Sequence, residues 1–193
     1  MVVTAGILLT GGRSRRLGVD KATLRIGSET LAERGGRILG AVCAPVIEVG
    51  DGGSGLPAVR EDPPGSGPLA ALAAAAARLR ELGHTGNVVV LGVDLPAVGA
   101  PLLARLRDHV GEPTVVPKVG GRLQLVCARY GSDALVAAAS LVAGGVRALH
   151  ELLDVVDHDV LEPDAWAHVA TADDFTDVDT PADAARLGIA LPG

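Results

Sequence analysis

The sequence predicts an α/β fold in three layers, with a mostly parallel sheet between two layers of helices. The first observation behind this prediction is the alternation of apolar strand-like runs with helical stretches along the 193 residues. The second is the run at residues 87–93 (NVVVLGV), which is continuously apolar and therefore typical of a strand covered on both faces. Because parallel α/β sheets bind ligands beyond the carboxyl ends of their strands, we expect a functional site at that edge.

The individual elements follow from the apolar pattern, with proline and glycine marking their ends. Strands are predicted at residues 2–9, 45–50, 57–61, 87–93, 113–119, 123–130, 155–161 and 166–170. Helices are predicted at residues 30–42, 68–82, 101–110, 132–143, 146–153 and 181–187. Pro68, Pro101 and Pro181 each suit a first helical turn. The chain has no linker or repeat, and its length suits one domain, so residues 1–193 are expected to form a single domain.

Composition narrows the classes of function. The formal net charge is −6, so nucleic acid, whose phosphates need broad neutralisation, is not an expected partner. No apolar run reaches the roughly 18 residues that a membrane span needs. Neither a signal peptide nor a paired-cysteine motif is evident. We therefore expect a cytoplasmic protein that binds no membrane and takes a small anionic ligand.

Residues 8–24 (LLTGGRSRRLGVDKATL) are the stretch around which the chain is organised. Gly11 and Gly12 follow the first strand, so the backbone can turn tightly and present its N–H groups to a ligand oxygen. Arg16 and Lys21 add positive charge, and lysine occurs at only one other position in the chain. A compact ammonium kept among many arginines indicates a phosphate-binding role for Lys21. The alternative is a basic, solvated surface loop.

Commoner phosphate-binding motifs are absent or out of context. No GxxxxGK[ST] sequence occurs, which argues against a P-loop nucleoside triphosphatase. Gly50, Gly52 and Gly55 form a G-x-G-x-x-G, but prolines follow where a dinucleotide-binding motif would open a helix. We therefore predict that residues 51–56 form a flexible surface loop.

Residues 9–24 also carry a resemblance to a known family. They match the pattern L-A-G-G-x-S-x-R-M-G-x-D-K-A-x-L of the molybdenum cofactor guanylyltransferases, within the nucleotidyltransferases, with conservative departures at Thr10 and Leu17. Weaker similarities follow in the family's order at residues 61–62, 67–69, 93–96, 127–130 and 177–181. The chain thus resembles this family over nearly its whole length.

The resemblance implies a Rossmann-like nucleotidyltransferase fold and transfer of GMP from GTP to the terminal phosphate of molybdopterin, with release of pyrophosphate. Mg²⁺ is the implied cofactor and Asp94 its ligand. The implied catalytic residues are Arg16, Lys21 and Asp94. The residues implied to bind the nucleotide are Leu9, Thr10, Gly11, Gly12, Lys21, Asp62 and Asp94. GTP and molybdopterin are the implied substrates, with transient contact to molybdenum-insertion proteins or apo-molybdoenzymes.

Asp94 is the first acidic residue after the continuous apolar strand. A carboxylate there could hold Mg²⁺ against nucleotide phosphates, because Mg²⁺ prefers oxygen ligands. The alternative role is a helix cap. Asp177 and Asp179 stand where the family often has asparagine, and they are candidates for a second metal ligand. Their alternative role is to cap the helix that Pro181 opens.

Asp62 is expected to be a buried carboxylate that contacts GTP. It could accept hydrogen bonds from both the N1–H and N2–H groups of guanine, a pattern that adenine and cytosine lack; contact with the ribose is the alternative. The resemblance places residues 127–130 on the acceptor side of the site. Cys127 lies in an apolar run with no histidine nearby in sequence, so we expect a packed strand residue rather than a nucleophile.

Two other functions stay open at this point. A related nucleotidyltransferase could use CTP or a different phosphorylated acceptor, and a non-catalytic nucleotide-binding protein could keep the same fold. Lys21, Asp94 and the whole opening pattern argue for an enzyme. The reaction needs no general base, because a phosphate monoester is already an anion at neutral pH.

Overall fold

The computed structural model describes residues 3–11 and 17–191. Its main sheet has the strand order β10-β7-β9-β6-β1-β4-β5, and β8 pairs with β7. The strands of this sheet are β1 (Ala5–Leu9), β4 (Val46–Val49), β5 (Ala58–Val59), β6 (Val88–Gly92), β7 (Thr114–Val119), β8 (Arg122–Leu123), β9 (Cys127–Tyr130) and β10 (His158–Leu161). A separate small pair joins β2 (Arg25–Ile26) to β3 (Glu29–Thr30).

Most of the main sheet is parallel, as predicted. β1 pairs in parallel with β4 and β6, β4 with β5, and β7 with β10. β9 runs antiparallel between β6 and β7. The chain reverses after β7 at Gly120 and Gly121, whose φ angles of 54° and 82° suit glycine. The carboxyl ends of β1, β4, β5, β6 and β7 therefore meet at one edge of the sheet.

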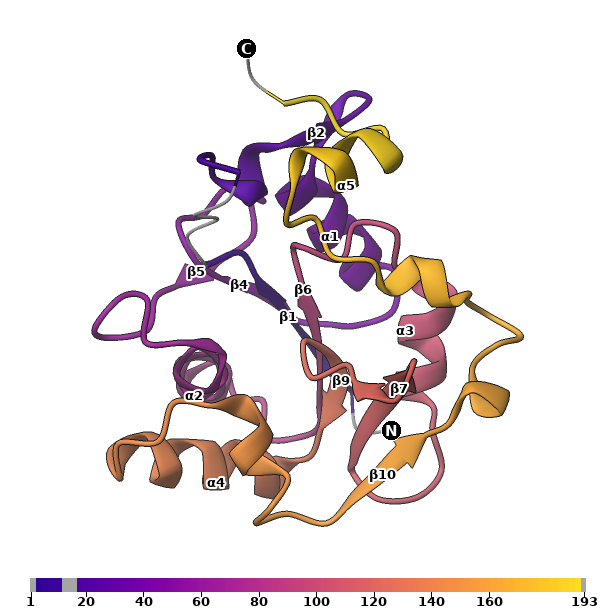
Figure 1. Cartoon of the computed structure of the whole chain (residues 1–193). Helices are drawn as coiled ribbons and strands as arrows, with labels where there is room; N and C mark the ends of the chain where they lie inside the picture. The colour runs from indigo at the N-terminus through magenta and orange to yellow at the C-terminus, as the bar shows by residue number, and fades with distance from the viewer. Residues whose placement is uncertain (1–2, 12–16, 192–193) are drawn as a thin grey trace.

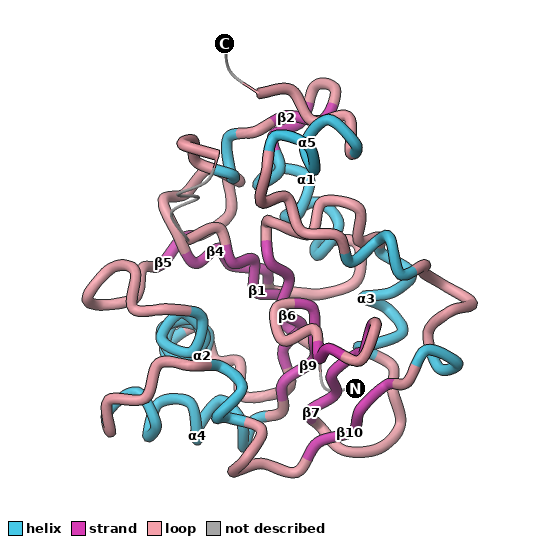
Figure 2. Tube along the Cα trace, viewed as in Figure 1, coloured by secondary structure: helices cyan, strands magenta, loops and turns pink. Residues whose placement is uncertain are grey.

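Helices cover both faces of the sheet (Figure 1). They are α1 (Leu31–Gly40), α2 (Pro68–Glu81), α3 (Ala100–Arg107), α4 (Ser132–Ala143) and α5 (Pro181–Arg186). Short 3₁₀ turns are η1 (Lys21–Thr23), η2 (Leu149–Leu152), η3 (Pro163–Ala165) and η4 (Ala172–Phe175). Figure 2 shows α2 and α4 together on one side of the strands, α1 and α3 on the other, and α5 beside β2. Among the described residues, no helix has both the length and the apolar character needed to cross a membrane.

Alternate side chains of β1 fill the two core layers. Ile7 packs with residues of α2 and α4, whereas Leu8 packs with residues of α1 and α3, and both are fully buried. A Cβ on Gly35 of α1 would lie 2.6 Å from Cδ1 of Leu8, so this glycine weakens the helix but lets it approach the strand. The predicted sheet between two helix layers is confirmed.

Several sequence predictions of local structure are wrong, and the single strand predicted at residues 123–130 is divided into β8 and β9. Residues 166–170, predicted as a strand, form turns after η3, and Trp166 packs edge-on against Phe175 with ring centroids 5.2 Å apart. Residues 146–153, predicted as a helix, contain only the short turn η2. The helix predicted at residues 101–110 ends at Arg107, and Val110 is exposed. Trp166 is buried although it lies in a turn, and a local apolar pattern does not distinguish a buried turn from a strand.

Candidate active site

The predicted catalytic residues Lys21 and Asp94 come together at the carboxyl edge of the sheet. Lys21 begins η1, and Asp94 lies just beyond the end of β6. The backbone N–H of Val93 donates a hydrogen bond of 2.9 Å to the carbonyl of Leu9, which ties the ends of β6 and β1 together. Lys21 Nζ lies 4.0 Å from Asp94 Oδ2. The parallel pairing of β1 with β6 thus brings the loop lysine and the strand-end aspartate side by side.

A third segment, just before α5, completes this cluster. Lys21 Nζ donates a hydrogen bond of 2.5 Å to Asp179 Oδ1. The backbone N–H of Val178 donates to the carbonyl of Asp94 at 2.9 Å, which holds the segment against the end of β6. The Lys21 side chain is only 12% exposed, against 34% for Asp94 and 47% for Asp179. The ammonium is therefore enclosed, while both carboxylates remain accessible.

Negative charge is concentrated around this ammonium. Burial raises the pKa of the Asp94 carboxyl; Lys21 opposes this and Asp179 adds to it. Partial desolvation raises the pKa of Asp177, as do the charges of Asp94 and Asp179, while Lys21 and Arg122 oppose the rise. Both shifts have the sign expected for acids that crowd together. The cluster would therefore gain from a further cation.

The three aspartates of the cluster do not cap helices. α3 starts after Gly99, which makes no side-chain cap. α5 is capped by Thr180, whose Oγ1 accepts a hydrogen bond of 3.2 Å from the N–H of Asp183. The capping alternative considered for the aspartates is therefore wrong, and their side chains stay available for a ligand.

The start of the glycine-rich loop differs from expectation. The N–H groups of Thr10 and Gly11 both donate to the carbonyl of Val49, at 3.0 and 3.2 Å. These two donors are thus bonded to β4, and the expectation that the Gly11 N–H faces a ligand oxygen is wrong. The remaining predicted residues of this loop, Gly12 and Arg16, lie outside the described residues.

Asp62 follows β5 at the same edge and is exposed, so the expectation of a buried carboxylate is wrong. Its neighbour Glu61 lies nearer to the loop, with Oε1 4.0 Å from the position that a Cβ on Gly11 would take. The same Oε1 accepts a hydrogen bond of 2.8 Å from the N–H of Gly65. Residues 61–62 are therefore beside the glycine-rich loop, as a nucleotide site requires.

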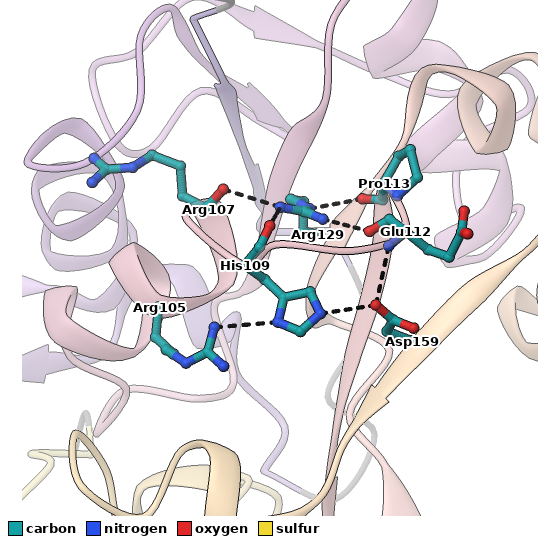
Figure 3. A network of polar contacts seen from close by, with 7 residues as sticks. All are labelled: Arg105, Arg107, His109, Glu112, Pro113, Arg129 and Asp159. Atoms are coloured by element: carbon teal, nitrogen blue, oxygen red, sulfur yellow. Dashed lines mark hydrogen bonds and ion pairs between the residues drawn. The ribbon is translucent and has the colours of Figure 1, made fainter.

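Within the stretch at residues 127–130, the side chain of Arg129 does not reach the site. Arg129 is 3% exposed and donates hydrogen bonds to backbone carbonyls at the end of α3 and the start of β7 (Figure 3). The four acceptors are Arg107, His109, Glu112 and Pro113. Because β7 begins at the amino edge of the sheet, this cluster lies at the opposite end from Lys21. Arg129 is therefore a structural residue, whereas Cys127, at the start of β9, pairs with Leu91 near the carboxyl edge.

Cys127 is a packed strand residue, as predicted. It is fully buried in β9, and burial raises the pKa of its thiol to about 12. A thiol so hard to ionise is a poor nucleophile at neutral pH.

Replacing Arg129 by methionine should destabilise the protein by about 2 to 4 kcal/mol, because four carbonyls lose a charged donor inside the fold. Urea unfolding followed by circular dichroism measures this loss. Nucleotide affinity of the folded protein should stay unchanged, since the cluster lies far from Lys21. A variant that kept its stability but lost nucleotide affinity would contradict the structural role.

Comparison with known proteins places the chain in a family. A model of the family described as "MobA-like NTP transferase domain" matches residues 6–159. The chain belongs to this family. The resemblance drawn from residues 9–24 is confirmed. A Mycobacterium bovis protein named "Probable molybdenum cofactor guanylyltransferase" is 36% identical over 166 residues, which cover 81% of this chain and 82% of that protein. A Mycobacterium avium protein of the same name is 34% identical, covering 79% of this chain and 82% of that protein.

Solved structures of MobA-like and related proteins share the fold. Molybdopterin-guanine dinucleotide biosynthesis protein A from Archaeoglobus fulgidus has a TM-score of 0.78 at 20% identity, covering 95% of this chain and 96% of that one. A nucleotidyl transferase from Methanothermobacter thermautotroptrophicus has a TM-score of 0.68 at 20% identity, covering 96% and 95%. A manganese complex of a Mycobacterium tuberculosis H37Rv protein has a TM-score of 0.65 at 20% identity, covering 96% and 97%. The predicted nucleotidyltransferase fold is confirmed.

Proposed function

We propose that this MobA-like protein transfers GMP from GTP to the terminal phosphate of molybdopterin, giving the guanine dinucleotide form of the cofactor and pyrophosphate. The observation that carries the proposal is the proximity of Lys21 Nζ to Asp94 Oδ2, which lie 4.0 Å apart at the carboxyl edge of the sheet. The names of the relatives at 36% and 34% identity support GTP as donor and molybdopterin as acceptor. We also propose that residues 1–193 form one catalytic domain and that the protein acts in the cytoplasm.

The donor atoms at the site fit a magnesium ion. Asp94 offers a partly exposed carboxylate. The charge of Asp179 raises the pKa of Asp94, and the charges of Asp94 and Asp179 raise the pKa of Asp177, so the three carboxylates lie close together. The described residues include no group of three or more acids, histidines or cysteines arranged to hold a metal ion. Mg²⁺ does not need one, because it typically takes one or two carboxylates together with phosphate and water. We propose Asp94 as the ligand, with Asp177 or Asp179 as candidates for a second.

When bound, the ion would supply positive charge to the phosphates and to the pyrophosphate leaving group. Lys21 would contact phosphate oxygens of GTP as a fixed point charge, since its ammonium is enclosed by the fold. Asp179 keeps that ammonium pointed at the site through their 2.5 Å contact. Arg16 is proposed to add charge from the glycine-rich loop.

In the reaction, an oxygen of the molybdopterin phosphate forms a bond to the α-phosphorus of GTP. The bond from that phosphorus to the oxygen shared with the β-phosphate breaks, and pyrophosphate leaves with the electron pair. No side chain needs to remove a proton, because the attacking phosphate is already an anion. The protein's contribution is therefore positioning and charge stabilisation.

Base preference tests the choice of nucleotide. GTP, inosine triphosphate, ATP and CTP are offered in parallel with molybdopterin, and pyrophosphate release is measured. If Asp62 accepts N1–H and N2–H of guanine, GTP should be preferred over ATP and CTP by about tenfold, the scale of one or two exposed hydrogen bonds. Inosine triphosphate, which lacks the N2 amine, should fall between GTP and ATP.

The variant Asp62→Ala should flatten this ranking and leave the magnesium dependence intact, because Asp62 and Asp94 lie on different segments of the site. Preference for CTP would redirect the assignment to a cytidylyltransferase. Turnover of none of the four nucleotides would indicate a nucleotide-binding protein without this activity.

A further inference from the structure

Glu48, in the middle of β4, is a fully buried acid outside the cluster around Lys21. Its Oε1 accepts hydrogen bonds from Thr10 Oγ1 at 2.6 Å and from the N–H groups of Gly52 and Gly53 at 2.9 and 3.1 Å. Its Oε2 accepts from both the N–H and the hydroxyl of Ser54. A buried carboxylate without partners would be very costly, so this complete set of donors explains how the charge is tolerated.

The partners of Glu48 explain the G-x-G-x-x-G sequence at residues 50–55. Three successive N–H groups of this loop point at one carboxylate, which is the arrangement by which glycine-rich loops bind anions. Here the anion belongs to the chain itself. Burial alone would raise the pKa of Glu48, but the hydrogen bonds from Ser54, Thr10 and Gly52 outweigh it and lower the pKa, so the group stays charged at neutral pH.

The same contacts join the loop at residues 50–55 to Thr10, at the start of the glycine-rich loop that follows β1. A Cβ on Gly50 would lie 1.9 Å from Thr10 Oγ1, so the hydroxyl reaches Glu48 only because position 50 has no side chain. On its other side the loop packs on α1, where a Cβ on Gly36 would lie 3.1 Å from Leu56 Cδ1. Residues 51–56 are therefore anchored between β1 and α1, whereas the sequence predicted a flexible loop.

Thr10 is also one of the two departures from the family's opening pattern, where alanine is usual. Alanine has no hydroxyl to donate to Glu48, so this contact requires the threonine. The next residue, Gly11, donates a backbone hydrogen bond to the carbonyl of Val49 and lies beside Glu61. Glu61 directly precedes Asp62, the residue proposed to contact the base. One carboxylate thus holds both the point where the chain leaves β1 and the loop that precedes β5.

We propose that Glu48 is a positioning residue for nucleotide binding: it ties Thr10, where the chain enters the glycine-rich loop after β1, to the anchored residues 52–54, and so fixes the start of that loop. The inference deepens the proposed function and rests on it for the identity of the nucleotide. Glu48 does not touch substrate, because its carboxylate is fully buried. Its removal should therefore change the affinity for GTP more than the rate of the chemical step.

The test compares the wild type with Glu48→Gln, Thr10→Val and the double variant. Glutamine directs an NH₂ group at N–H donors, so Glu48→Gln should raise both the KM and the directly measured Kd for GTP at least about tenfold, with kcat changed less than about threefold. Thr10→Val should have a smaller effect in the same direction. The double variant should be less impaired than the sum of the two, because the residues act as one unit.

Thr114→Val is the matched control. Thr114 is fully buried like Glu48, and its Oγ1 accepts one hydrogen bond of 3.1 Å from the N–H of Gly131 at the amino edge. It should lower stability without changing GTP affinity. Hydrogen exchange at Gly52, Gly53 and Ser54 gives a readout independent of catalysis: protection should be lost in Glu48→Gln and kept in Thr114→Val.

Each outcome decides the inference. Lost protection with weaker GTP binding supports it. The inference would be overturned if Glu48→Gln lost protection but kept its GTP affinity, or if its GTP affinity fell no more than that of Thr114→Val. Additive effects in the double variant would also overturn it. If the wild type binds GTP without transferring GMP to molybdopterin, the proposed function fails, while the effect of Glu48→Gln on Kd still tests the positioning role.

Discussion

Replacing Lys21 by alanine should abolish GMP transfer and weaken GTP binding while the protein remains folded. The ammonium lies 2.5 Å from Asp179 and 4.0 Å from Asp94, so its removal leaves acidic groups without their neighbouring positive charge. Those acids would repel the phosphates that Lys21 is proposed to hold. We expect a loss of more than about a thousandfold in kcat/KM, the upper range for one charge-stabilising group. Pyrophosphate release measures activity, and circular dichroism measures folding.

Two further lysine variants sharpen this prediction. Lys21→Arg should restore only part of the activity, because a planar guanidinium does not fit the place of a compact ammonium enclosed to 12% exposure. Lys118→Ala removes the other lysine, which pairs with Glu162 at 3.0 Å on the surface, and should leave activity unchanged. Wild-type turnover in Lys21→Ala would show that the glycine-rich loop has been assigned wrongly.

The location of the site could be predicted from sequence because it depends on strand direction. A continuous apolar run indicates a strand buried on both faces, and such strands in α/β folds run parallel. Parallel strands bring their carboxyl ends to one edge, so Lys21 and Asp94, 4.0 Å apart, follow from where their two strands end. Neither residue needed a long-range contact to be recognised.

The contacts of Asp179 and Glu48 could not be predicted in this way. Asp179 precedes a proline-initiated helix, so its local sequence favours capping as much as an ion pair, and its partner lies 158 positions away. Glu48 stands in an otherwise apolar strand, where the acid itself was the available signal. Its donors come from Thr10, just beyond β1, and from a loop whose sequence predicted only a flexible surface loop. Only the folded structure shows that the anion is internal.

The position of the buried Arg129 side chain could not be predicted either. Arg129 lies in a stretch that matches the family in order, and the resemblance associates this stretch with the acceptor side of the site. The structure instead places it at the amino edge of the sheet, where backbone carbonyls at the end of α3 and the start of β7 accept its hydrogen bonds. Similarity in the order of motifs therefore did not show at which edge of the sheet the Arg129 side chain makes its contacts.

Replacing Asp94 by asparagine should reduce magnesium-dependent transfer at least about a hundredfold, the scale of one lost contact to transition-state charge. Asparagine keeps the shape of the side chain and its hydrogen-bonding oxygen but removes the charge that a divalent ion needs. A magnesium titration of pyrophosphate release, run beside the wild type, measures the change. Unchanged metal dependence in the variant would remove Asp94 from the metal site.

Stability should change in the opposite direction to activity. The pKa of Asp94 is raised in the folded protein, chiefly by burial, so the folded state binds a proton more tightly than the unfolded state does. At neutral pH the carboxylate is charged in both states, and its burial lowers the free energy of unfolding. Asp94→Asn should therefore keep or raise the Tm at pH 7, and its advantage over the wild type should shrink as the pH falls through the folded pKa. A lower Tm for the variant at pH 7 would show that the charge of Asp94 stabilises the fold, and the separation of function from stability at this residue would be lost.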